Sequence, residues 1–549
     1  MGKIVIIGGV AGGATAAARL RRLDERAEIV MFERGQHISF ANCGLPYHIG
    51  GVIEDREDLL LQTPESFKTR FNVDVRVMCE VESIDRGAKT VFVKNSLTRE
   101  SYSENYDTLI LAPGGAPIKP PIEGIDSDRV FTLRNVADTD RIKKFILEKQ
   151  PRSAAIVGGG FIGIEMAENL KEAGLDVSVI ELSDQVIAPL DIDLACDVHK
   201  YLRRQGVSLL LNNGLQRITQ QDDGLSAEVT NGLVKTDMLI LAIGVKPETN
   251  LAKDAGLELN ARGGIITDKY MRTSDNDIYA VGDAVEVVDY VTGQAAMIPL
   301  AGPANKQARI AADNICGMPS EYGGTQGSAV IKVFDMTVAS TGINEKTAKR
   351  LGLDYDKVFL WSPSHAGYYP GASQMSMKII FEKGSGKILG AQIAGFDGVD
   401  KRCDVLAVAI RAGMTAYDLI KLELCYAPPF SSAKDPVNMA GYMIENVING
   451  LVKNFHWHDV SALPRDGSVT LLDVRTPQET ARGGIEGFQS IPLDTLRGRI
   501  GELDVSKPVY VHCQSGLRSY LAARILSLNG FDVYNLSGGY RLYNAATSP

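Results

Sequence analysis

Short runs of consecutive apolar residues, each followed by a glycine-rich turn, recur along the first half of the chain. Residues 3–7 and 153–157 are two such runs, and a helical pattern follows each of them. Strands that are buried on both faces of a parallel sheet read as continuous apolar runs, so we predict two βαβ units. Their second strands are expected at 28–32 and 176–180.

The first turn is typical of a dinucleotide-binding site. Gly8 and Gly13 occupy the outer positions of a G-x-G-x-x-G pattern, Val10 replaces its middle glycine, and Glu33 ends the next strand. Glycines let the backbone approach a pyrophosphate at a helix N-terminus, and an acid about twenty residues on accepts ribose hydroxyls. A purely structural turn is the alternative, but strand, helix, strand and acid together favour a nucleotide.

The second turn carries the unbroken pattern. Gly158, Gly160 and Gly163 form it, and Glu181 ends the following strand. A carboxylate at this position would repel a 2′-phosphate and accept hydrogen bonds from free ribose hydroxyls. The second unit is therefore predicted to bind NADH rather than NADPH.

Each unit is followed by another apolar strand that runs into a glycine turn, at Gly114 and at Gly244. This repetition indicates two related nucleotide domains. Further along, Gly282 and Asp283 follow a short apolar strand. Asp283 could bind a ribityl chain or simply cap a helix that starts beside it.

Length and composition indicate a folded, multidomain protein. The 549 residues correspond to about three or four domains. The formal net charge of −9 argues against a nucleic-acid-binding surface. We find no signal peptide and no apolar run long enough to span a membrane, so we expect a cytoplasmic protein. The seven cysteines show no Cys-x-x-Cys motif and no metal-ligand spacing, and no metal site is expected.

One cysteine lies a short loop downstream of the first unit. Our hypothesis is that Cys43, in the segment 39–47, is a redox centre, which requires an electron carrier beside it and a group that lowers its pKa. On the helix before it, Arg19 and Arg22 share a face with Thr15 one turn earlier. This face could hold a second phosphorylated ligand or could be an ordinary solvated face.

Together, the glycine turns, the strand-glycine repeats and the Val-Gly-Asp segment resemble the pyridine nucleotide-disulfide oxidoreductases over residues 1–442. The resemblance implies an α/β protein with two Rossmann-like domains for FAD and NAD and an α+β dimerisation domain. The implied bounds are 1–115 and 250–325 for a split FAD domain, 116–249 for the NAD domain and 326–442 for the dimerisation domain, which we expect to contain alternating strands and two helices. The implied cofactor-binding residues are Gly8, Gly13, Glu33, Gly114, Gly158, Gly160, Gly163, Glu181, Gly244, Gly282 and Asp283.

Members of this family that reduce ordinary disulfides carry two cysteines spaced Cys-x-x-x-x-Cys, whereas this chain has Ile38 and His48 at the spacings where a partner of Cys43 would lie. Cys43 must then cycle through a mixed disulfide, a persulfide or a sulfenic acid. The segment is most similar to that of the coenzyme A disulfide reductases. That resemblance implies the substrate-binding residues Thr15, Arg19, Arg22, Ser39, Asn42, Asn305 and Lys434. It also implies a homodimer in which Tyr368 and Tyr426 reach the active cysteine of the other subunit.

The C-terminal part has a different pattern. Residues 443–457 are interpreted as a linker, and residues 458–549 resemble a rhodanese, an α/β domain. Cys513 lies between an apolar strand and a predicted helix, where backbone N–H groups and the helix terminus favour a thiolate or persulfide anion. By this resemblance Cys513 is a sulfur carrier and Arg518 an anion ligand, although an inert scaffold is the alternative.

The expected function is that of an FAD-dependent reductase that uses NADH to reduce coenzyme A persulfide, polysulfide or coenzyme A disulfide at Cys43, with Cys513 as a tethered sulfur carrier. The sequence leaves open which substrate sulfur Cys43 attacks and whether Cys513 passes sulfur to Cys43 directly or through coenzyme A. Two alternatives remain. One is an NADH oxidase or peroxidase that cycles through a Cys43 sulfenic acid, and the other is a sulfur-binding redox sensor or trafficking scaffold.

Overall fold

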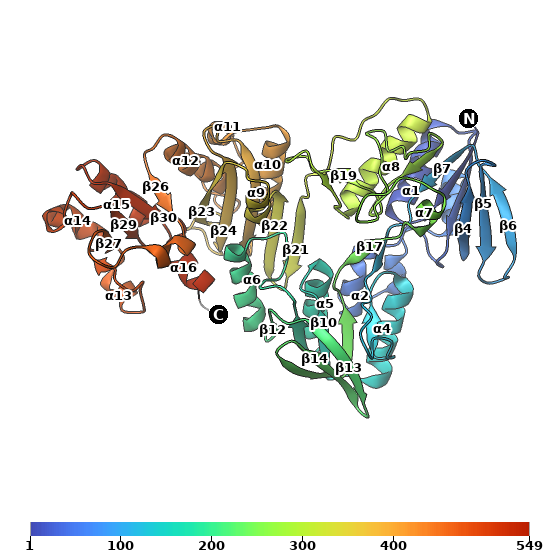
Figure 1. Ribbon diagram of the computed structural model, residues 1–549, viewed down its shortest axis with the longest axis horizontal. Helices are drawn as coiled ribbons and strands as arrows, with labels where there is room; N and C mark the ends of the chain where they lie inside the picture. The colour runs from blue at the N-terminus through green and yellow to red at the C-terminus, as the bar shows by residue number, and fades with distance from the viewer. Residues whose placement is uncertain (1, 548–549) are drawn as a thin grey trace. The chain divides into compact units, whose positions relative to one another are not determined.

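The computed structural model describes residues 2–547, and the contacts along the chain divide it into two compact units (Figure 1). The first unit comprises Met1–Ser183 and Gly206–Gly327, and the second comprises Asp184–Gln205 and Ser328–Pro549. The chain therefore leaves the first unit for α6 (Ile192–Arg204), returns to it, and leaves it again near residue 327.

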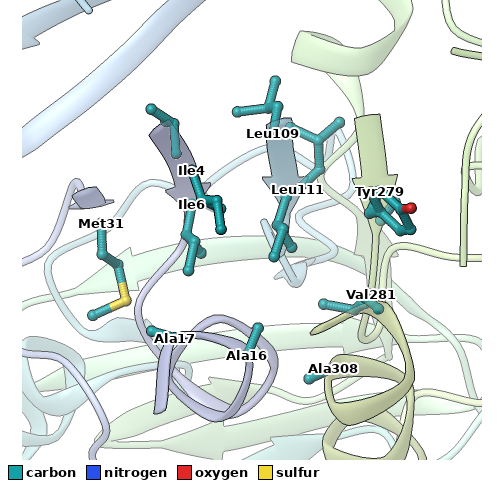
Figure 2. Close-up of a cluster of buried hydrophobic side chains, with 14 of the residues drawn as sticks. Ile4, Ile6, Ala16, Ala17, Met31, Leu109, Leu111, Tyr279, Val281 and Ala308 are labelled. Carbon is teal, nitrogen blue, oxygen red and sulfur yellow. The ribbon is translucent and has the colours of Figure 1, made fainter. Parts of the chain in front are cut away.

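A five-stranded parallel sheet organises the first nucleotide domain, in the order β18-β7-β1-β2-β3. Its strands are β1 (Lys3–Ile7), β2 (Glu28–Glu33), β3 (Asp74–Val77), β7 (Thr108–Leu111) and β18 (Ile278–Ala280). Helices α1 (Ala11–Leu23) and α8 (Ala301–Ile315) pack against it through small residues, among them Ala16, Ala17 and Ala308 (Figure 2). These alanines have no exposed surface, and their size lets both helices approach the sheet closely.

Smaller elements complete this domain. The active-site segment consists of η1 (Asn42–Gly44) and α2 (Leu45–Ile49), and η2 (Arg56–Leu59), α3 (Pro64–Phe71) and α7 (Asn250–Asp254) lie elsewhere in the domain. An antiparallel sheet contains β4 (Cys79–Asp85), β5 (Thr90–Asn95) and β6 (Ser101–Asn105). A two-stranded pair is formed by β19 (Val287–Val288) and β20 (Ala295–Ala296).

The second nucleotide domain repeats the parallel architecture in the order β12-β11-β10-β16-β9. The strands are β9 (Val130–Thr132), β10 (Ser153–Val157), β11 (Asp176–Ile180), β12 (Ser208–Leu210) and β16 (Met238–Leu241). Its helices are α4 (Val136–Lys149) and α5 (Phe161–Glu172), and its antiparallel strands are β13 (Leu215–Gln221), β14 (Gly224–Val229) and β15 (Gly232–Thr236). β8 (Gly115–Pro117) pairs with β17 (Val245–Pro247). These two strands lie in the two segments of chain that connect the nucleotide domains.

The second unit contains an antiparallel sheet in the order β21-β22-β25-β24-β23. Its strands are β21 (Ala329–Val333), β22 (Met336–Gly342), β23 (Tyr355–Pro363), β24 (Gln374–Glu382) and β25 (Ile388–Gly395). We expected two helices here, and the structure has four between residues 328 and 448: α9 (Glu345–Arg350), α10 (Val399–Arg411), α11 (Ala416–Lys421) and α12 (Pro436–Ile448). Two of them contain only six residues, too few for a clear helical period in the sequence.

The C-terminal domain is a five-stranded parallel sheet in the order β26-β30-β29-β27-β28. Its strands are β26 (Lys453–Phe455), β27 (Thr470–Asp473), β28 (Gln489–Ser490), β29 (Val509–His512) and β30 (Val533–Leu536). α14 (Leu493–Arg499) and α15 (Leu517–Ser527) contribute to the core on one face, and η3 (Trp457–Ala462) and α16 (Gly539–Thr547) to that on the other (Figure 1). α13 (Pro477–Thr480) and η4 (Ile500–Glu502) complete it.

Two further expectations differ from the structure. The segment 443–457, interpreted as a linker, contains the end of α12 and all of β26, which pairs with β30 inside the C-terminal sheet. No helix begins beside Asp283, because the next helix, α8, starts at Ala301. The capping interpretation of Asp283 is therefore wrong. Among the described residues, no helix is long and apolar enough to cross a membrane.

Candidate active site

The first glycine turn is built for close backbone packing. Gly8 has a φ of +100°, and a Cβ atom there would lie 2.1 Å from the carbonyl oxygen of Ala112, so only glycine fits. The Glu33 carboxylate accepts hydrogen bonds from Gly9 N at 2.9 Å and Gly35 N at 2.8 Å. This strand end therefore holds an oriented carboxylate beside the N-terminus of α1, as a dinucleotide ribose and pyrophosphate require.

The second turn has the same construction. Gly158 has a φ of +109°, and a Cβ atom there would lie 2.3 Å from the carbonyl oxygen of Ala242. A Cβ atom on Gly160 would meet nothing within 4 Å, so the space in front of this turn is open to a ligand. Glu181 accepts hydrogen bonds from Gly159 N at 2.6 Å and Ser183 N at 2.8 Å. Both turns thus fit a dinucleotide.

The remaining predicted cofactor residues lie at the expected strand ends. Gly114, Gly244 and Gly282 all have positive φ, at +72°, +116° and +88°. Asp283 follows β18 and is half-buried, and this burial raises the pKa of its carboxyl although Arg134 opposes the shift. Gln307 accepts a hydrogen bond from Gly282 N at 2.7 Å, which fixes this turn to α8.

The predicted redox thiol is presented by a short helical turn. Cys43 lies in η1 and is exposed. Its loop is held by hydrogen bonds from Ala41 N to Leu59 O at 2.8 Å and from Gly44 N to Ala41 O at 2.9 Å. Ser39 adopts a left-handed conformation with a φ of +44°, which turns the chain into this loop. Asn42, next to the thiol, is exposed as well.

Within the first unit, the groups around Cys43 disfavour its thiolate. Partial burial raises the pKa of the Cys43 thiol, and the carboxylates of Glu165 and Asp283 add to the effect. The expectation that a nearby group lowers this pKa is therefore not met by the groups of this unit.

Glu165 is a residue that the sequence analysis missed. It lies on α5, and burial together with Glu168 raises the pKa of its carboxyl to about 7. Its carboxylate also contributes to the raised pKa of Tyr47. The signal was present in the sequence, because Glu165 follows the last glycine of the second turn by two positions. A group that titrates near neutrality beside a reactive thiol is a candidate functional residue.

Three predicted substrate residues, Thr15, Arg19 and Asn305, lie between α1 and α8, and a fourth, Arg22, lies near the end of α1. Thr15 Oγ1 donates a hydrogen bond to Asn305 Oδ1 at 2.7 Å, and Arg22 is exposed at the end of α1. The Arg19 guanidinium is already paired, because its Nε donates to Asp313 Oδ1 at 2.7 Å. Arg22 is therefore better placed than Arg19 to meet a phosphate.

The other predicted substrate and tyrosine residues belong to the second unit. The hydroxyl oxygens of Tyr368 and Tyr426 lie 3.1 Å apart, and both rings are exposed, at 76% and 48%. Lys434 is also exposed, just before α12. Exposed, paired phenols suit a role at a subunit interface, and their approach to Cys43 of another subunit stays a prediction.

The C-terminal thiol has a different environment. Cys513 follows β29 and is fully buried, and its Sγ accepts hydrogen bonds from Gly516 N at 3.1 Å and Ser519 Oγ at 3.3 Å. The loop leads directly into α15, whose N-terminus favours an anion. Ser519 was missed in the sequence, because only the folded loop brings it to the sulfur.

Arg518 is held by a carboxylate. Its Nη1 and Nη2 donate to the two oxygens of Glu479 at 2.8 and 2.6 Å, and this pairing lowers the pKa of the Glu479 carboxyl to about 2. Glu479 also accepts a hydrogen bond from Thr476 N at 2.9 Å. The geometry fixes the guanidinium beside the Cys513 loop, and its role as an anion ligand remains a prediction.

Fold and sites together define a class: a reductase with two dinucleotide turns and an exposed thiol on a short helical turn, joined to a further domain with its own thiol. Comparison with known families agrees. Residues 2–308 match the pyridine nucleotide-disulphide oxidoreductases, residues 328–436 match the dimerisation domain of that family, and residues 456–546 match the rhodanese-like domain. The chain belongs to the pyridine nucleotide-disulphide oxidoreductase family. Its fold is one that binds FAD and NAD(P)H, and its dimerisation domain indicates an oligomer.

Two solved structures are similar to almost the whole chain, and a further relative is similar to 80% of it. The crystal structure of reduced Bacillus anthracis CoADR-RHD has 52% identity and a TM-score of 0.97, covering 99% of this chain and 98% of that one. An NAD-dependent persulfide reductase from A. fulgidus has 40% identity and a TM-score of 0.92, covering 98% and 99%. A coenzyme A disulfide reductase from Staphylococcus epidermidis is 38% identical over 444 residues, 80% of this chain and 99% of that protein.

Proposed function

We propose that the chain is an FAD-dependent, NADH-using reductase of coenzyme A persulfide, polysulfide and coenzyme A disulfide, with Cys43 as its redox thiol. The observation that carries the proposal is the isolation of this thiol. Cys43 is exposed, and the positions five residues to either side hold the buried Ile38 and His48. No second cysteine of the loop can resolve an oxidised Cys43, so the second sulfur comes from the substrate.

The surface between α1 and α8 supports a nucleotide thiol as the substrate. Arg22 offers an exposed guanidinium, a group that binds phosphate oxygens through charge-assisted hydrogen bonds. About two turns earlier on the same helix, the Thr15–Asn305 pair offers a hydroxyl and an amide. Coenzyme A combines phosphates with a terminal thiol, so one ligand would occupy this surface and reach Cys43. Ser39, Asn42 and, in the second unit, Lys434 complete the proposed set.

Bound NADH and FAD supply a hydride and a route for two electrons to sulfur. The chain's own contribution is the thiolate chemistry at Cys43. Attack on the inner sulfur of coenzyme A persulfide forms a Cys43–coenzyme A disulfide, breaks the S–S bond and releases hydrosulfide. Attack on the outer sulfur instead forms a Cys43 persulfide and releases coenzyme A. Two electrons then break the new S–S bond and restore the Cys43 thiolate, with release of coenzyme A thiolate in the first route and of hydrosulfide in the second.

The phenols of the second unit fit a role in this cycle. We place Tyr368 and Tyr426 of one subunit near Cys43 of another in a homodimer. Their hydroxyl groups, 3.1 Å apart, could donate hydrogen bonds to a sulfur anion or protonate the leaving thiolate. Such donors would offset the raised pKa that the first unit alone gives to the Cys43 thiol.

The nicotinamide cofactor is NADH in this proposal. Glu181 is fixed by two backbone N–H groups at the end of β11, where a 2′-phosphate would meet a carboxylate. Among the described residues no cysteine forms a disulfide bond, which fits a reducing compartment such as the cytoplasm.

Cys513 is proposed to carry sulfur. Two donors and the N-terminus of α15 surround its Sγ, an environment that stabilises an anionic persulfide. It would load sulfur onto coenzyme A or pass it towards Cys43. Because both thiols belong to one chain, transfer between them does not depend on a diffusing partner.

The test is anaerobic NADH consumption by the FAD-loaded enzyme with coenzyme A persulfide, coenzyme A disulfide, polysulfide and hydrogen peroxide, and with NADPH in a parallel series. We expect turnover with the sulfur substrates, little with peroxide, and a preference for NADH. Turnover with peroxide alone would replace the proposal with a peroxidase that cycles through sulfenic acid. An absence of turnover with every acceptor, together with tight sulfur binding, would indicate a sensor or scaffold.

A further inference from the structure

Strand β23 of the dimerisation domain contacts the rhodanese-like domain along its length. It is an edge strand, so its outer backbone groups have no neighbouring strand to pair with. Phe359 N donates a hydrogen bond to Ser537 Oγ at 3.2 Å, and Trp361 Nε1 donates to Gly538 O at 3.2 Å. Both acceptors belong to the turn between β30 and α16.

A cation–π contact adds to this interface. The guanidinium carbon of Arg541, in the first turn of α16, lies 3.7 Å from the centroid of the Trp361 ring. An arginine over the face of a tryptophan is the strongest common form of this interaction. The segment 537–541 is thus held by β23 through a hydroxyl, a backbone carbonyl and a guanidinium.

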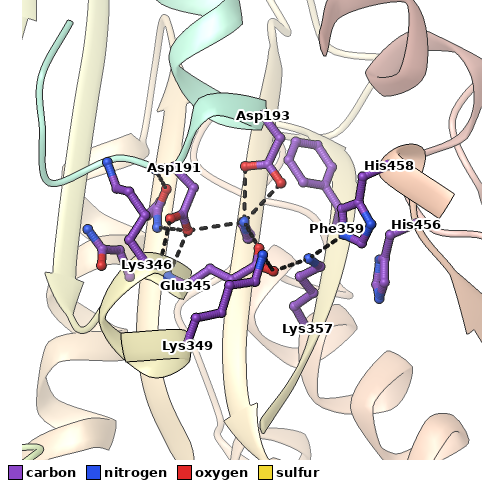
Figure 3. A network of polar contacts seen from close by, with 12 residues as sticks. Asp191, Asp193, Glu345, Lys346, Lys349, Lys357, Phe359, His456 and His458 are labelled. Atoms are coloured by element: carbon purple, nitrogen blue, oxygen red, sulfur yellow. Dashed lines mark hydrogen bonds and ion pairs between the residues drawn. The ribbon is translucent and has the colours of Figure 1, made fainter. Parts of the chain in front are cut away.

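The other end of β23 is fixed by a buried ionic cluster (Figure 3). Lys357 Nζ lies 2.5 Å from Glu345 Oε1 and 3.2 Å from His458 Nε2 in the rhodanese-like domain. Glu345 also accepts a hydrogen bond from Lys378 Nζ at 2.8 Å, and Lys378 is 1% exposed and bonded to Asp193. Alternate residues of a strand lie on the same face, so Lys357 and Trp361 both project from one side of β23. From that side they make two separate contacts with the rhodanese-like domain.

The same turn also supports the Cys513 loop. Tyr540 N donates to Cys513 O at 2.8 Å, and Arg541 N donates to Gln514 O at 2.9 Å. A Cβ atom on Gly539 would lie 2.7 Å from Cys513 O, so the turn and the loop are in direct backbone contact. The segment 537–541 therefore makes two sets of contacts. Its side chains and a carbonyl group contact β23, and its backbone N–H groups bind the Cys513 loop.

We propose that β23 of the dimerisation domain is part of the sulfur-transfer site, and that Trp361, Ser537 and Arg541 are positioning residues for Cys513. The inference rests on the proposed role of Cys513 as sulfur carrier. By holding the 537–541 turn, β23 fixes the Cys513 loop in the geometry where Gly516 N and Ser519 Oγ point at Sγ. The rhodanese-like domain is then a docked part of the reductase and not a freely swinging arm.

Thiosulfate and cyanide provide a probe that uses Cys513 alone. The thiolate attacks the outer sulfur of thiosulfate, the S–S bond breaks, and sulfite leaves with the electron pair. Cyanide then attacks the outer sulfur of the Cys513 persulfide, forms thiocyanate and restores the thiolate. NADH-dependent reduction of coenzyme A disulfide reports on the Cys43 site of the same FAD-loaded protein.

The test compares Arg541→Gln, Arg541→Lys, Trp361→Phe and Ser537→Ala in the full-length protein. Arg541→Gln should lower the sulfur-transfer rate three- to tenfold and alter its pH dependence, because the loop donors no longer hold the sulfur anion as well. Arg541→Lys keeps a cation over the ring and should recover most of the rate. Arg497→Gln, which alters an exposed arginine on α14 of the same domain, is the matched control and should have no effect. Reduction of coenzyme A disulfide should stay within twofold in all variants.

Two failures can be told apart. Sulfur transfer that survives Cys513→Ser would overturn the proposed function of that thiol. If Cys513→Ser abolishes transfer but Arg541→Gln, Trp361→Phe and Ser537→Ala all leave its rate and pH dependence unchanged, the positioning role of β23 is wrong. Equal losses in Arg541→Gln and Arg541→Lys would also contradict the cation–π contact as its basis.

Discussion

The two proposed reactive cysteines lie in opposite settings. Cys43 is partly exposed on a short helical turn, and partial burial together with nearby carboxylates raises the pKa of its thiol. Cys513 has no exposed surface, and a backbone N–H and a hydroxyl donate hydrogen bonds to its sulfur. One thiol is open and poorly stabilised as an anion by its own unit, and the other is enclosed by groups suited to an anion.

The site of Cys513 contains the donors that stabilise its sulfur within its own domain. Every hydrogen-bond donor that we assign to the Cys513 sulfur comes from residues 513–519 of the rhodanese-like domain. The turn at 537–541 supports this loop through backbone hydrogen bonds. The loop of Cys43 provides exposure, and we propose that a cofactor, a substrate and the phenols of a second subunit provide its stabilisation. The contrast predicts that changes that stop reduction at Cys43 leave sulfur transfer at Cys513 intact. It also predicts that changes that stop sulfur transfer at Cys513 leave reduction at Cys43 intact.

The largest effect is expected from Cys513→Ser. Transfer of sulfur from thiosulfate to cyanide should fall about a thousandfold or more, because a hydroxyl does not replace the thiolate nucleophile. Anaerobic reduction of coenzyme A disulfide by NADH, measured on the same sample, should stay within about twofold of wild type. If Cys513→Ser transfers sulfur at the wild-type rate with every sulfur donor, the proposed role of Cys513 as a sulfur carrier is contradicted.

Arg22→Ala should separate the two sites by affinity. Loss of one charge-assisted hydrogen bond to a phosphate should raise the KM for coenzyme A disulfide about tenfold. The rate of thiosulfate-dependent transfer should not change. Arg26→Ala, which removes an exposed arginine just beyond α1, is the control. An unchanged KM in Arg22→Ala would mean that Arg22 lies on an ordinary solvated face.

Glu165→Gln should make the Cys43 thiol react faster with iodoacetamide, but only at higher pH. The pKa of the Glu165 carboxyl is about 7, so its charge, which raises the pKa of the Cys43 thiol, is present above that pH and is lost as the pH falls through it. Removing this charge should therefore accelerate alkylation roughly twofold above pH 7 and have no effect well below it. An equal acceleration at all pH values would exclude this electrostatic coupling.

A small effect, comparable to that of Glu165→Gln, is expected from Ser519→Ala. Sγ of Cys513 keeps the Gly516 N–H and loses one hydroxyl donor, so sulfur transfer should slow by roughly threefold. Steady-state thiosulfate assays measure this change, and Ser527→Ala at the far end of α15 is the control. A loss as large as that of Cys513→Ser would show that the hydroxyl does more than hold the sulfur.

Much of the fold could be predicted because its main strands are continuous apolar runs. β1, β10 and β11 begin and end where the sequence pattern places them, and the glycine turns after β1 and β10 have the geometry that their spacing indicates. The family and its added rhodanese-like domain followed from these motifs. What failed were short elements: the six-residue α9 and α11 have too few positions to show a period.

Contacts between distant residues could not be predicted. Trp361 and Arg541 meet across 180 positions, and neither lies in a motif. The sequence shows that Glu165 lies next to a glycine turn. The pKa of about 7 for its carboxyl, however, arises from burial that only the folded structure creates. The same holds for Ser519, which reaches the sulfur because α15 begins beside it.

The most direct test of the account is Cys43→Ser, assayed anaerobically for NADH consumption with coenzyme A persulfide and coenzyme A disulfide. We predict a loss of about a thousandfold or more with both substrates. Thiosulfate-dependent sulfur transfer by Cys513 in the same preparation should remain near the wild-type rate and show that the protein is folded. Unchanged persulfide turnover in Cys43→Ser would contradict the central claim that Cys43 is the redox thiol.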